Sequence, residues 1–228
     1  MIQDLWRVMQ ADHDMVWDLL NQLTGGAGSP SGSPKEHRRL ARELVAIESA
    51  HEAAEELVIW PVVRRVCPDG EDLVFHATGQ ERQAKRALNE LSAIKAGNKD
   101  FEECVATVAS HARQHITYEQ NQIWPRLADH LTAEEADRLG RRWVDARLRG
   151  PTRPHPHTPP MPGALASAGY LLARLDRLRD ALTGRKVPTP AALSTRPPAP
   201  PATDPERGAA PETVAVAPRA EESTVIGS

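Results

Sequence analysis

The sequence predicts an all-α protein, an antiparallel up-down-up-down four-helix bundle with a short fifth helix and a largely disordered C-terminal tail rich in proline and alanine. Three observations lead to this prediction. Apolar residues recur every three or four positions in four long stretches, turn-forming residues separate these stretches, and proline becomes frequent only after residue 150. Short connections between successive long helices favour antiparallel neighbours.

The expected long helices cover residues 2–23, 35–66, 71–95 and 100–130. The gaps between them contain Gly25-Gly26 followed by two prolines, Pro68-Asp69-Gly70, and Gly97-Asn98. Asp100 with Glu103 predicts a capping box at the start of the fourth helix. Thr132 with Glu135 predicts a second capping box, which begins a fifth helix over about 136–148 that should cover an end of the bundle.

The chain divides at residue 150 into a bundle, 1–150, and a tail, 151–228. All five tryptophans precede this point, and 15 of the 20 prolines follow it. Such a tail cannot bury enough apolar surface to offset the entropy of ordering its backbone, so most of it is expected to be disordered. Leu171, Leu175, Leu178 and Leu182 nevertheless share one face, which predicts an amphipathic helix over 165–183. This helix either docks on the bundle, meets a partner, or packs only intermittently.

Composition excludes several classes of partner. The formal net charge is −3 with mixed signs, so no basic stripe is available for nucleic acid or an anionic membrane. No apolar run approaches a membrane span, and the first residues lack the pattern of a signal peptide, so a cytoplasmic location is expected. Two cysteines, Cys67 and Cys104, provide neither a disulfide framework nor a thiolate metal site.

One sequence block, H-x-x-x-E-x-x-x-I-W-P, occurs twice with identical spacing, beginning at His51 and at His115. Residues four apart lie on the same face of a helix, so each block presents an imidazole and a carboxylate, Glu55 or Glu119, to a common point. The proline of each block either bends its helix around that point or marks the final turns of the helix.

These histidines and glutamates interrupt apolar rows that should face the core. The first helix has His13 at the middle of its apolar row, and the third helix has Glu81 in the same situation. A buried carboxylate without a partner is costly, so it requires a proton, a cationic group or a metal. The flanking Glu48, Glu52 and Glu56 are expected to be solvated, with Glu52 close enough to serve as an alternative ligand.

Inward histidines and carboxylates from facing helices are how bundles form dinuclear iron or manganese sites. His111, one turn before His115, is either a further ligand or a group that orients one. The candidate metal ligands are His13, His51, Glu55, Glu81, His111, His115 and Glu119.

Over residues 1–150 this pattern resembles the hemerythrin-like HHE cation-binding family. The resemblance rests on one histidine in the first helix, His-x-x-x-Glu in the second, and His-x-x-x-Glu followed by Trp-Pro in the fourth. Residues 151–157 and 180–185 also look like the tails of actinobacterial members. The resemblance implies an antiparallel bundle around an oxo- or hydroxo-bridged di-iron centre, with His13, His51, Glu55, His115 and Glu119 as ligands. Relatives bind oxygen, sense oxygen or iron, or act on peroxide or nitric oxide.

The third helix departs from the family pattern. Oxygen-binding relatives commonly place His-x-x-x-His there, whereas this chain has Glu81 and Lys85. Because a protonated ammonium group cannot bind a metal, the departure argues against reversible oxygen carriage and favours peroxide or nitric oxide chemistry. Lys85 either neutralises Glu81 within its helix or takes the place of one metal and pairs with Glu55 or Glu119.

Two functions follow as hypotheses. The first is a non-haem iron-binding protein, with manganese as the alternative metal, that senses or reacts with oxygen, peroxide or nitric oxide. The second is a metal-free helical scaffold or protein-interaction module whose core is an ion pair between Lys85 and glutamates. A protein partner recruited by the tail is a further expectation. Whether the chain is an enzyme stays open at this point.

Overall fold

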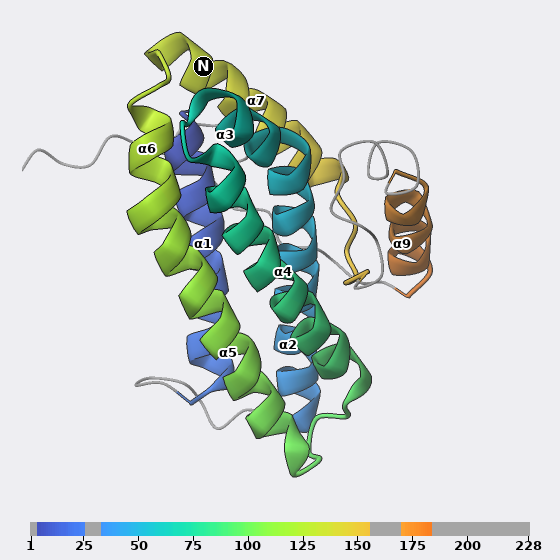
Figure 1. Ribbon diagram of the computed structural model, residues 1–228. Helices are drawn as coiled ribbons and strands as arrows, with labels where there is room; N and C mark the ends of the chain where they lie inside the picture. The colour runs from blue at the N-terminus through green and yellow to red at the C-terminus, as the bar shows by residue number, and fades with distance from the viewer. Residues whose placement is uncertain (1–3, 26–32, 156–169, 184–228) are drawn as a thin grey trace, which may run out of the picture. The chain divides into compact units, whose positions relative to one another are not determined.

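The computed structural model describes residues 4–25, 33–155 and 170–183, and every regular element in these ranges is helical (Figure 1). This confirms the predicted all-α class. None of the described helices is long and apolar enough to cross a membrane. The helices are α1 (Leu5–Leu23), α2 (Pro34–Ala54), α3 (Trp60–Val66), α4 (Gly70–Ala93), α5 (Asp100–Tyr118), α6 (Trp124–Ala128), α7 (Ala133–Arg149) and α9 (Tyr170–Thr183), with π-helical turns η1 (Glu55–Ile59) and η2 (Glu119–Ile123).

Side-chain caps begin three of these helices. The Asp4 carboxylate accepts a hydrogen bond from the backbone at the start of α1, and the Ser33 hydroxyl accepts one at the start of α2. Thr132 and Glu135 form the predicted capping box of α7. Each such cap satisfies backbone N–H groups that have no partner within the helix.

The predicted capping box at Asp100 and Glu103 is wrong. The residue that caps α5 is Lys99, whose side chain makes no capping hydrogen bond. Asn98 supplies the acceptor instead, because its side-chain oxygen lies 3.1 Å from the backbone nitrogen of Asp100. The cap that was expected from Asp100 and Glu103 is therefore provided by a loop residue two positions before the helix.

Helical structure continues past both prolines of the repeated block but ends soon after them, at Val66 and at Ala128, so each proline lies in the final turns of its helix. Each follows a π-helical turn, in which Trp60 donates its backbone N–H to the carbonyl of Glu55 and Trp124 donates to that of Glu119. Proline lacks an N–H and its ring crowds the carbonyl four residues earlier, and a wider turn is one way to accommodate it. Both π turns begin at a glutamate that was predicted to be a metal ligand.

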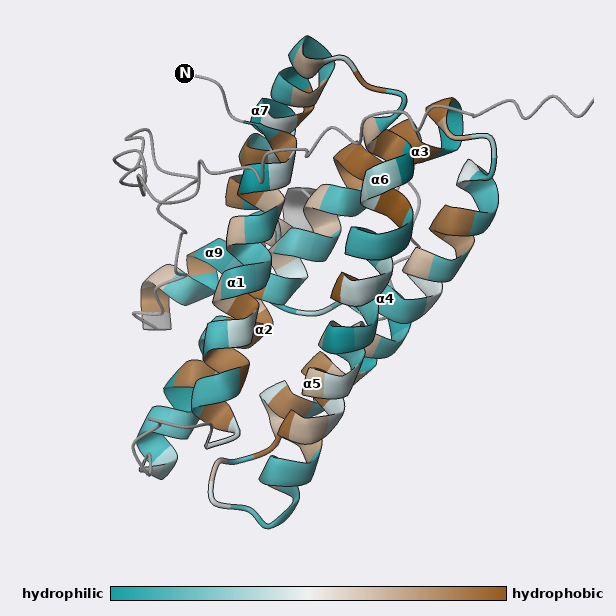
Figure 2. Cartoon of the chain, turned by 90° about the vertical axis from the view of Figure 1, so that its left-hand side faces the viewer, coloured by the Kyte–Doolittle hydropathy of each residue, from teal (hydrophilic) through white to brown (hydrophobic). Residues whose placement is uncertain are grey.

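The interior consists of two apolar clusters with a polar layer between them. Val8, Ile59 and Leu127 belong to one cluster, and Leu20 and Leu44 belong to the other. In Figure 2 the apolar residues lie mostly on the inner sides of the helices. In each of the four long segments the residues between the two clusters include a predicted ligand.

The fifth helix does more than cover an end of the bundle, which was the expectation. Helix α7 contacts α1, α2 and η1. Its Trp143 and Arg147 are almost completely buried, at 0% and 2% exposed. An arginine is buried this deeply only when it has a partner inside the protein.

Helix α9 leaves the predicted row of leucines exposed and buries two aspartates instead. Leu175, Leu178 and Leu182 are exposed, whereas Asp176 and Asp180 are buried. Both aspartates pair with Arg153, at 3.5 and 3.1 Å, so charge rather than apolar contact holds this face. The expected start of this helix at 165–169 and the expected disorder of 184–228 lie outside the described residues.

Replacing Leu44 by alanine tests the packing of the interior. Leu44 is fully buried, so Leu44→Ala should lower the free energy of unfolding by about 2–5 kcal/mol. Phe75→Ala is the matched control, since Phe75 is 67% exposed and should lose little. Urea unfolding measures both, and equal losses would contradict the assignment of the core.

Candidate metal centre

Six of the seven predicted ligands converge in the polar layer between the two apolar clusters. They form two groups whose ligand atoms all lie within 4.8 Å of one another. The first group is His13, His51, Glu55 and Glu119, and the second is Glu55, Glu81 and His115. All six are at most 4% exposed.

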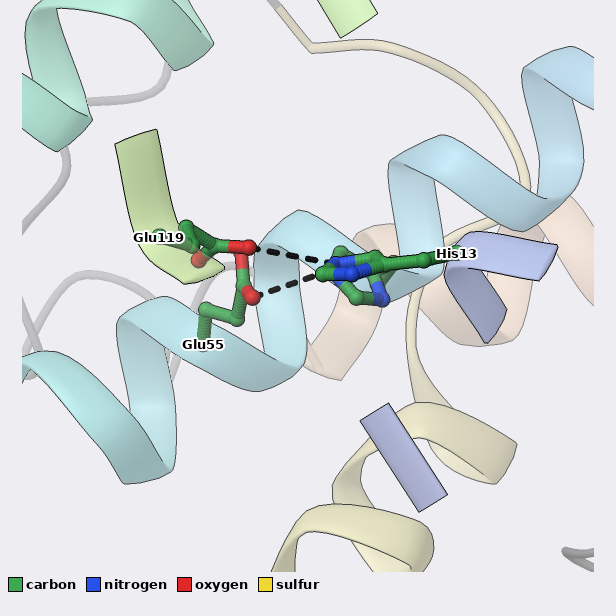
Figure 3. A group of neighbouring side chains, drawn as sticks. His13, Glu55 and Glu119 are labelled. Atoms are coloured by element: carbon green, nitrogen blue, oxygen red, sulfur yellow. Dashed lines mark hydrogen bonds and ion pairs between the residues drawn. The ribbon is translucent and has the colours of Figure 1, made fainter. Parts of the chain in front are cut away.

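The first group joins α1, α2 and the two π turns. The Nε2 atom of His13 lies 3.1 Å from a carboxylate oxygen of Glu119, as Figure 3 shows together with Glu55. The Nε2 atom of His51 lies 2.9 Å from Glu55 and 3.3 Å from the Nε2 atom of His13. Four potential ligand atoms from three parts of the chain therefore face one point.

The second group adds α4 and α5. The Nε2 atom of His115 lies 3.5 Å from one oxygen of Glu55 and 3.7 Å from one oxygen of Glu119. The indole N–H of Trp60 donates to the second-group carboxylate Glu81 at 2.6 Å, which fixes that side chain. Glu55 belongs to both groups, and one of its oxygens faces His51 while the other faces His115.

Each of the three histidines has a polar partner at its other ring nitrogen. The Nδ1 atom of His51 lies 3.2 Å from the Asp12 carboxylate, and that of His115 lies 3.4 Å from the side-chain oxygen of Gln80. The Nδ1 atom of His13 lies 3.3 Å from the side-chain amide of Gln120. The partners of His51 and His115 are oxygens, which can accept a hydrogen bond from Nδ1–H, fix the ring and leave Nε2 for a metal. The partner of His13 is an amide donor, which orients the ring by donating to Nδ1.

Protons occupy part of this centre in the metal-free protein. Burial opposes protonation of His115, yet Glu119 and Glu55 raise its pKa to about 10. Burial likewise opposes protonation of His51, and Glu55 and Asp12 raise its pKa well above its usual value. The opposite holds for His13, where burial and the neighbouring His51 lower the pKa to about 3.

The donor set fits a metal because it leaves buried oxygens without hydrogen bonds. Within the described residues, neither carboxylate oxygen of Glu55 or Glu119 accepts a hydrogen bond that meets normal geometry, and the Nε2 atom of His115 makes none either. Burial is the main cause that raises the pKa of Glu119 well above its usual value, and the negative charge of Glu55 is the second. A cation at this point would satisfy all of these atoms together.

A second polar cluster surrounds Lys85. Its ammonium group pairs closely with Glu56 and lies 3.8 Å from Glu52 and 3.9 Å from Glu81. The expectation that the flanking glutamates are solvated is wrong, because Glu48, Glu52 and Glu56 are 7%, 0% and 4% exposed. Helix α4 packs against α2 on this side, and its Lys85 pairs with Glu52 and Glu56.

The ion pairs of Lys85 involve other carboxylates than those of Glu55 and Glu119. Among the described residues Lys85 forms no ion pair with Glu55 or Glu119, which was one predicted alternative, and its pairing with Glu81 was the other. Burial opposes the charge of Lys85, and Glu52 and Glu81 raise its pKa despite that. Lys85 is thus a fixed positive charge beside the candidate ligands.

His111 is the predicted ligand that the structure does not bring to the centre. It is half-buried and belongs to neither group of potential ligands. Sequence reasoning in turn missed Asp12, Gln80 and Gln120. Each of these is the chain neighbour of a candidate ligand, a position that points about 100° away on the helix and therefore lies outside an apolar row.

The fold and the site together define a helical-bundle protein with a buried histidine and carboxylate cluster suited to metal ions. Residues 4–127 match the family model described as the hemerythrin HHE cation-binding domain. This match spans more than half of the chain, and the protein belongs to that family.

Two curated relatives match the chain at low identity. A hemerythrin-like protein of Schizosaccharomyces pombe (strain 972) is 24% identical over 166 residues, which cover 64% of this chain and 82% of that protein. A protein of Nostoc sp. (strain PCC 7120) named DNA nickase is 24% identical over 148 residues, which cover 65% of this chain but only 39% of the nickase. No solved structure matches the chain.

Removing the ammonium group of Lys85 should destabilise the metal-free protein. Lys85→Met leaves Glu56, Glu52 and Glu81 without their shared cation, at an expected cost of about 3 kcal/mol in the free energy of unfolding. Lys95→Met is the control, because Lys95 is exposed and forms no ion pair with the described residues. If chemical denaturation gives both variants the same stability, the Lys85 cluster contributes nothing.

Metal binding should release protons. The pKa of His115, raised to about 10, keeps this residue protonated near pH 8 in the metal-free protein, and the raised pKa of His51 favours its protonated form as well. A metal binds only the neutral imidazole. Affinity should therefore rise with pH until these groups lose their protons without metal. Calorimetry in two buffers of different ionisation enthalpy measures the release, and a binding heat independent of buffer would contradict it.

Proposed function

We propose that this protein holds a pair of iron ions in the centre described above and uses them to sense or react with peroxide or nitric oxide. The observation that carries the proposal is Glu55, which belongs to both groups of potential ligands and turns one oxygen toward His51 and the other toward His115. His13, His51 and Glu119 would hold one ion, and His115 and Glu81 the other. Mixed imidazole and carboxylate donors suit iron and also manganese, which is the alternative metal.

Burial limits what can reach the centre. All six ligand candidates are at most 4% exposed, and the surface pocket lined by α2, the end of α4 and residues 153–155 includes none of them. A substrate of ordinary metabolite size would have to open the bundle. Oxygen, nitric oxide and hydrogen peroxide are small enough to pass through the transient openings of a packed interior.

The residues of helix α4 favour redox chemistry over reversible oxygen carriage. This helix contributes Glu81 to the ligand candidates, and Lys85 stands one turn away in a network of carboxylates. Anionic oxygen ligands stabilise higher oxidation states of iron, while a carrier must return to the reduced state at every cycle. When bound, the iron pair would supply electrons to a small oxidant, and the protein would supply a dry and charge-balanced site.

Lys85 also motivates the second candidate function, a metal-free scaffold with an ion-pair core. The contacts of Lys85 with Glu56, Glu52 and Glu81 favour it. It leaves Glu119 and the convergent histidine nitrogens unexplained, however, because Lys85 does not pair with them. Chelation separates the two functions, since removing a resident metal should lower the melting temperature only if the first is correct.

A nicking activity on DNA is not part of the proposed function, although the Nostoc relative is named for one. The match covers only 39% of that protein. Two further proposals are a cytoplasmic location and a protein partner that binds through the tail.

Metal analysis of the purified protein tests the proposal. Protein reconstituted with ferrous iron should contain about two iron ions per chain and develop near-ultraviolet absorption bands on oxidation. His115→Ala should lose at least one of them, and it should also lose any turnover of hydrogen peroxide. His111→Ala is the matched control from the same helix and should keep both ions. Iron content near zero in the unaltered protein would refute the proposed function.

A further inference from the structure

Helix α7 reaches the candidate metal centre although it lies outside the part of the chain that defines the family. The family match ends at residue 127, and α7 begins at Ala133. Its Trp143 packs edge-on against the ring of His51, with ring centroids 5.4 Å apart. Just after α7, Gly150 lies so close to α2 that an added Cβ would be 3.1 Å from Ala50.

A continuous polar chain runs from α7 to the same histidine. The Nε atom of Arg147 donates to one carboxylate oxygen of Asp12, and its Nη2 atom lies 3.4 Å from the other. The oxygen that accepts from Nε also lies 3.2 Å from the Nδ1 atom of His51. Arg147, Asp12 and His51 are at most 2% exposed, so water competes little for these bonds.

This chain determines which nitrogen of His51 is available to a metal. An imidazole that donates its Nδ1–H to a carboxylate keeps its lone pair on Nε2. The Nε2 atom of His51 is the one that faces the centre, 2.9 Å from Glu55. The carboxylate of Asp12 needs a cationic partner to stay ionised at this depth, and among the described residues Arg147 is the guanidinium group that contacts it.

We infer that Arg147 and Asp12 are positioning residues for metal binding, and that α7 is therefore part of the metal centre through its hold on His51. Neither residue binds the metal itself. The inference rests on the proposed metal-binding function and extends it, because it makes the affinity of the centre depend on a helix that lies beyond the residues of the family match.

The competing explanation is that Arg147 and Asp12 form an ion pair that only stabilises the bundle. A buried ion pair is often no more stabilising than apolar residues of similar size, so replacing both partners separates the two roles. The double variant Asp12→Leu/Arg147→Met removes the pair without leaving an unpaired charge. It also removes the acceptor at the Nδ1 atom of His51.

The experiment measures the affinity of each purified variant for ferrous iron alone, by anaerobic competition with a chromogenic chelator. Asp12→Asn, Arg147→Met and the double variant should each bind about 10- to 100-fold more weakly than the unaltered protein. Arg147→Lys, which restores a positive charge, should recover part of that loss. Arg149→Ala is the control on the same helix, since Arg149 is exposed and its ion pair within the described residues is with the exposed Asp145.

Thermal unfolding of the metal-free variants accompanies these measurements. A double variant that is as stable as the unaltered protein but binds iron weakly supports the inference. If that variant binds iron with unaltered affinity, Arg147 and Asp12 are merely structural and the inference is overturned while the proposed function stands. If the unaltered protein itself binds no iron, both the inference and the proposed function fail.

Discussion

The organisation of this protein depends on compensating negative charge in a dry layer. Glu55, Glu81 and Glu119 meet three imidazoles between two apolar clusters, where an uncompensated carboxylate would cost several kcal/mol. In the metal-free protein, protons on His51 and His115 provide the compensation, as their raised pKa values indicate. A pair of metal ions would replace these protons, so metal binding and proton release are expected to be the same event.

Two separate devices keep this layer in order. On the α4 side, Lys85 balances the carboxylates of Glu52 and Glu56 and stands away from the shared ligand Glu55. On the other side, each histidine is held at Nδ1 by a partner on a neighbouring segment, and for His51 that partner is Asp12. The first device supplies charge and the second supplies orientation. Together they leave Nε2 atoms and carboxylate oxygens facing the interior.

Much of the fold and of the centre could be predicted because helical spacing is regular. The row containing His13 and the row containing Glu81 both turned out to be buried, as their apolar neighbours indicated. What could not be predicted depends on which helix covers a given face. Asp12 and Glu52 lie off their rows and would be solvated on an isolated helix, but α7 and α4 cover them. The metal roles of the seven predicted ligands remain predictions, and only His111 lies away from both groups.

The prolines and α9 also show that local sequence does not determine tertiary packing. Proline reliably indicates that a regular helix is disturbed, but the π turns at Glu55 and Glu119 depend on how the whole helix packs. In α9 the row of leucines is a stronger sequence signal than Asp176 and Asp180, yet the aspartates are buried because Arg153 lies opposite them. Periodicity identifies the faces of a helix, and only the tertiary partner decides which face is covered.

The central claim is that Glu55 lies between two metal ions. Crystals of the iron-loaded protein, measured at the iron absorption edge, test it directly through anomalous scattering. The account predicts two peaks about 4 Å apart, both beside the Glu55 carboxylate, one near His51 and the other near His115. A single peak, or two peaks of which one lies away from Glu55, would contradict it.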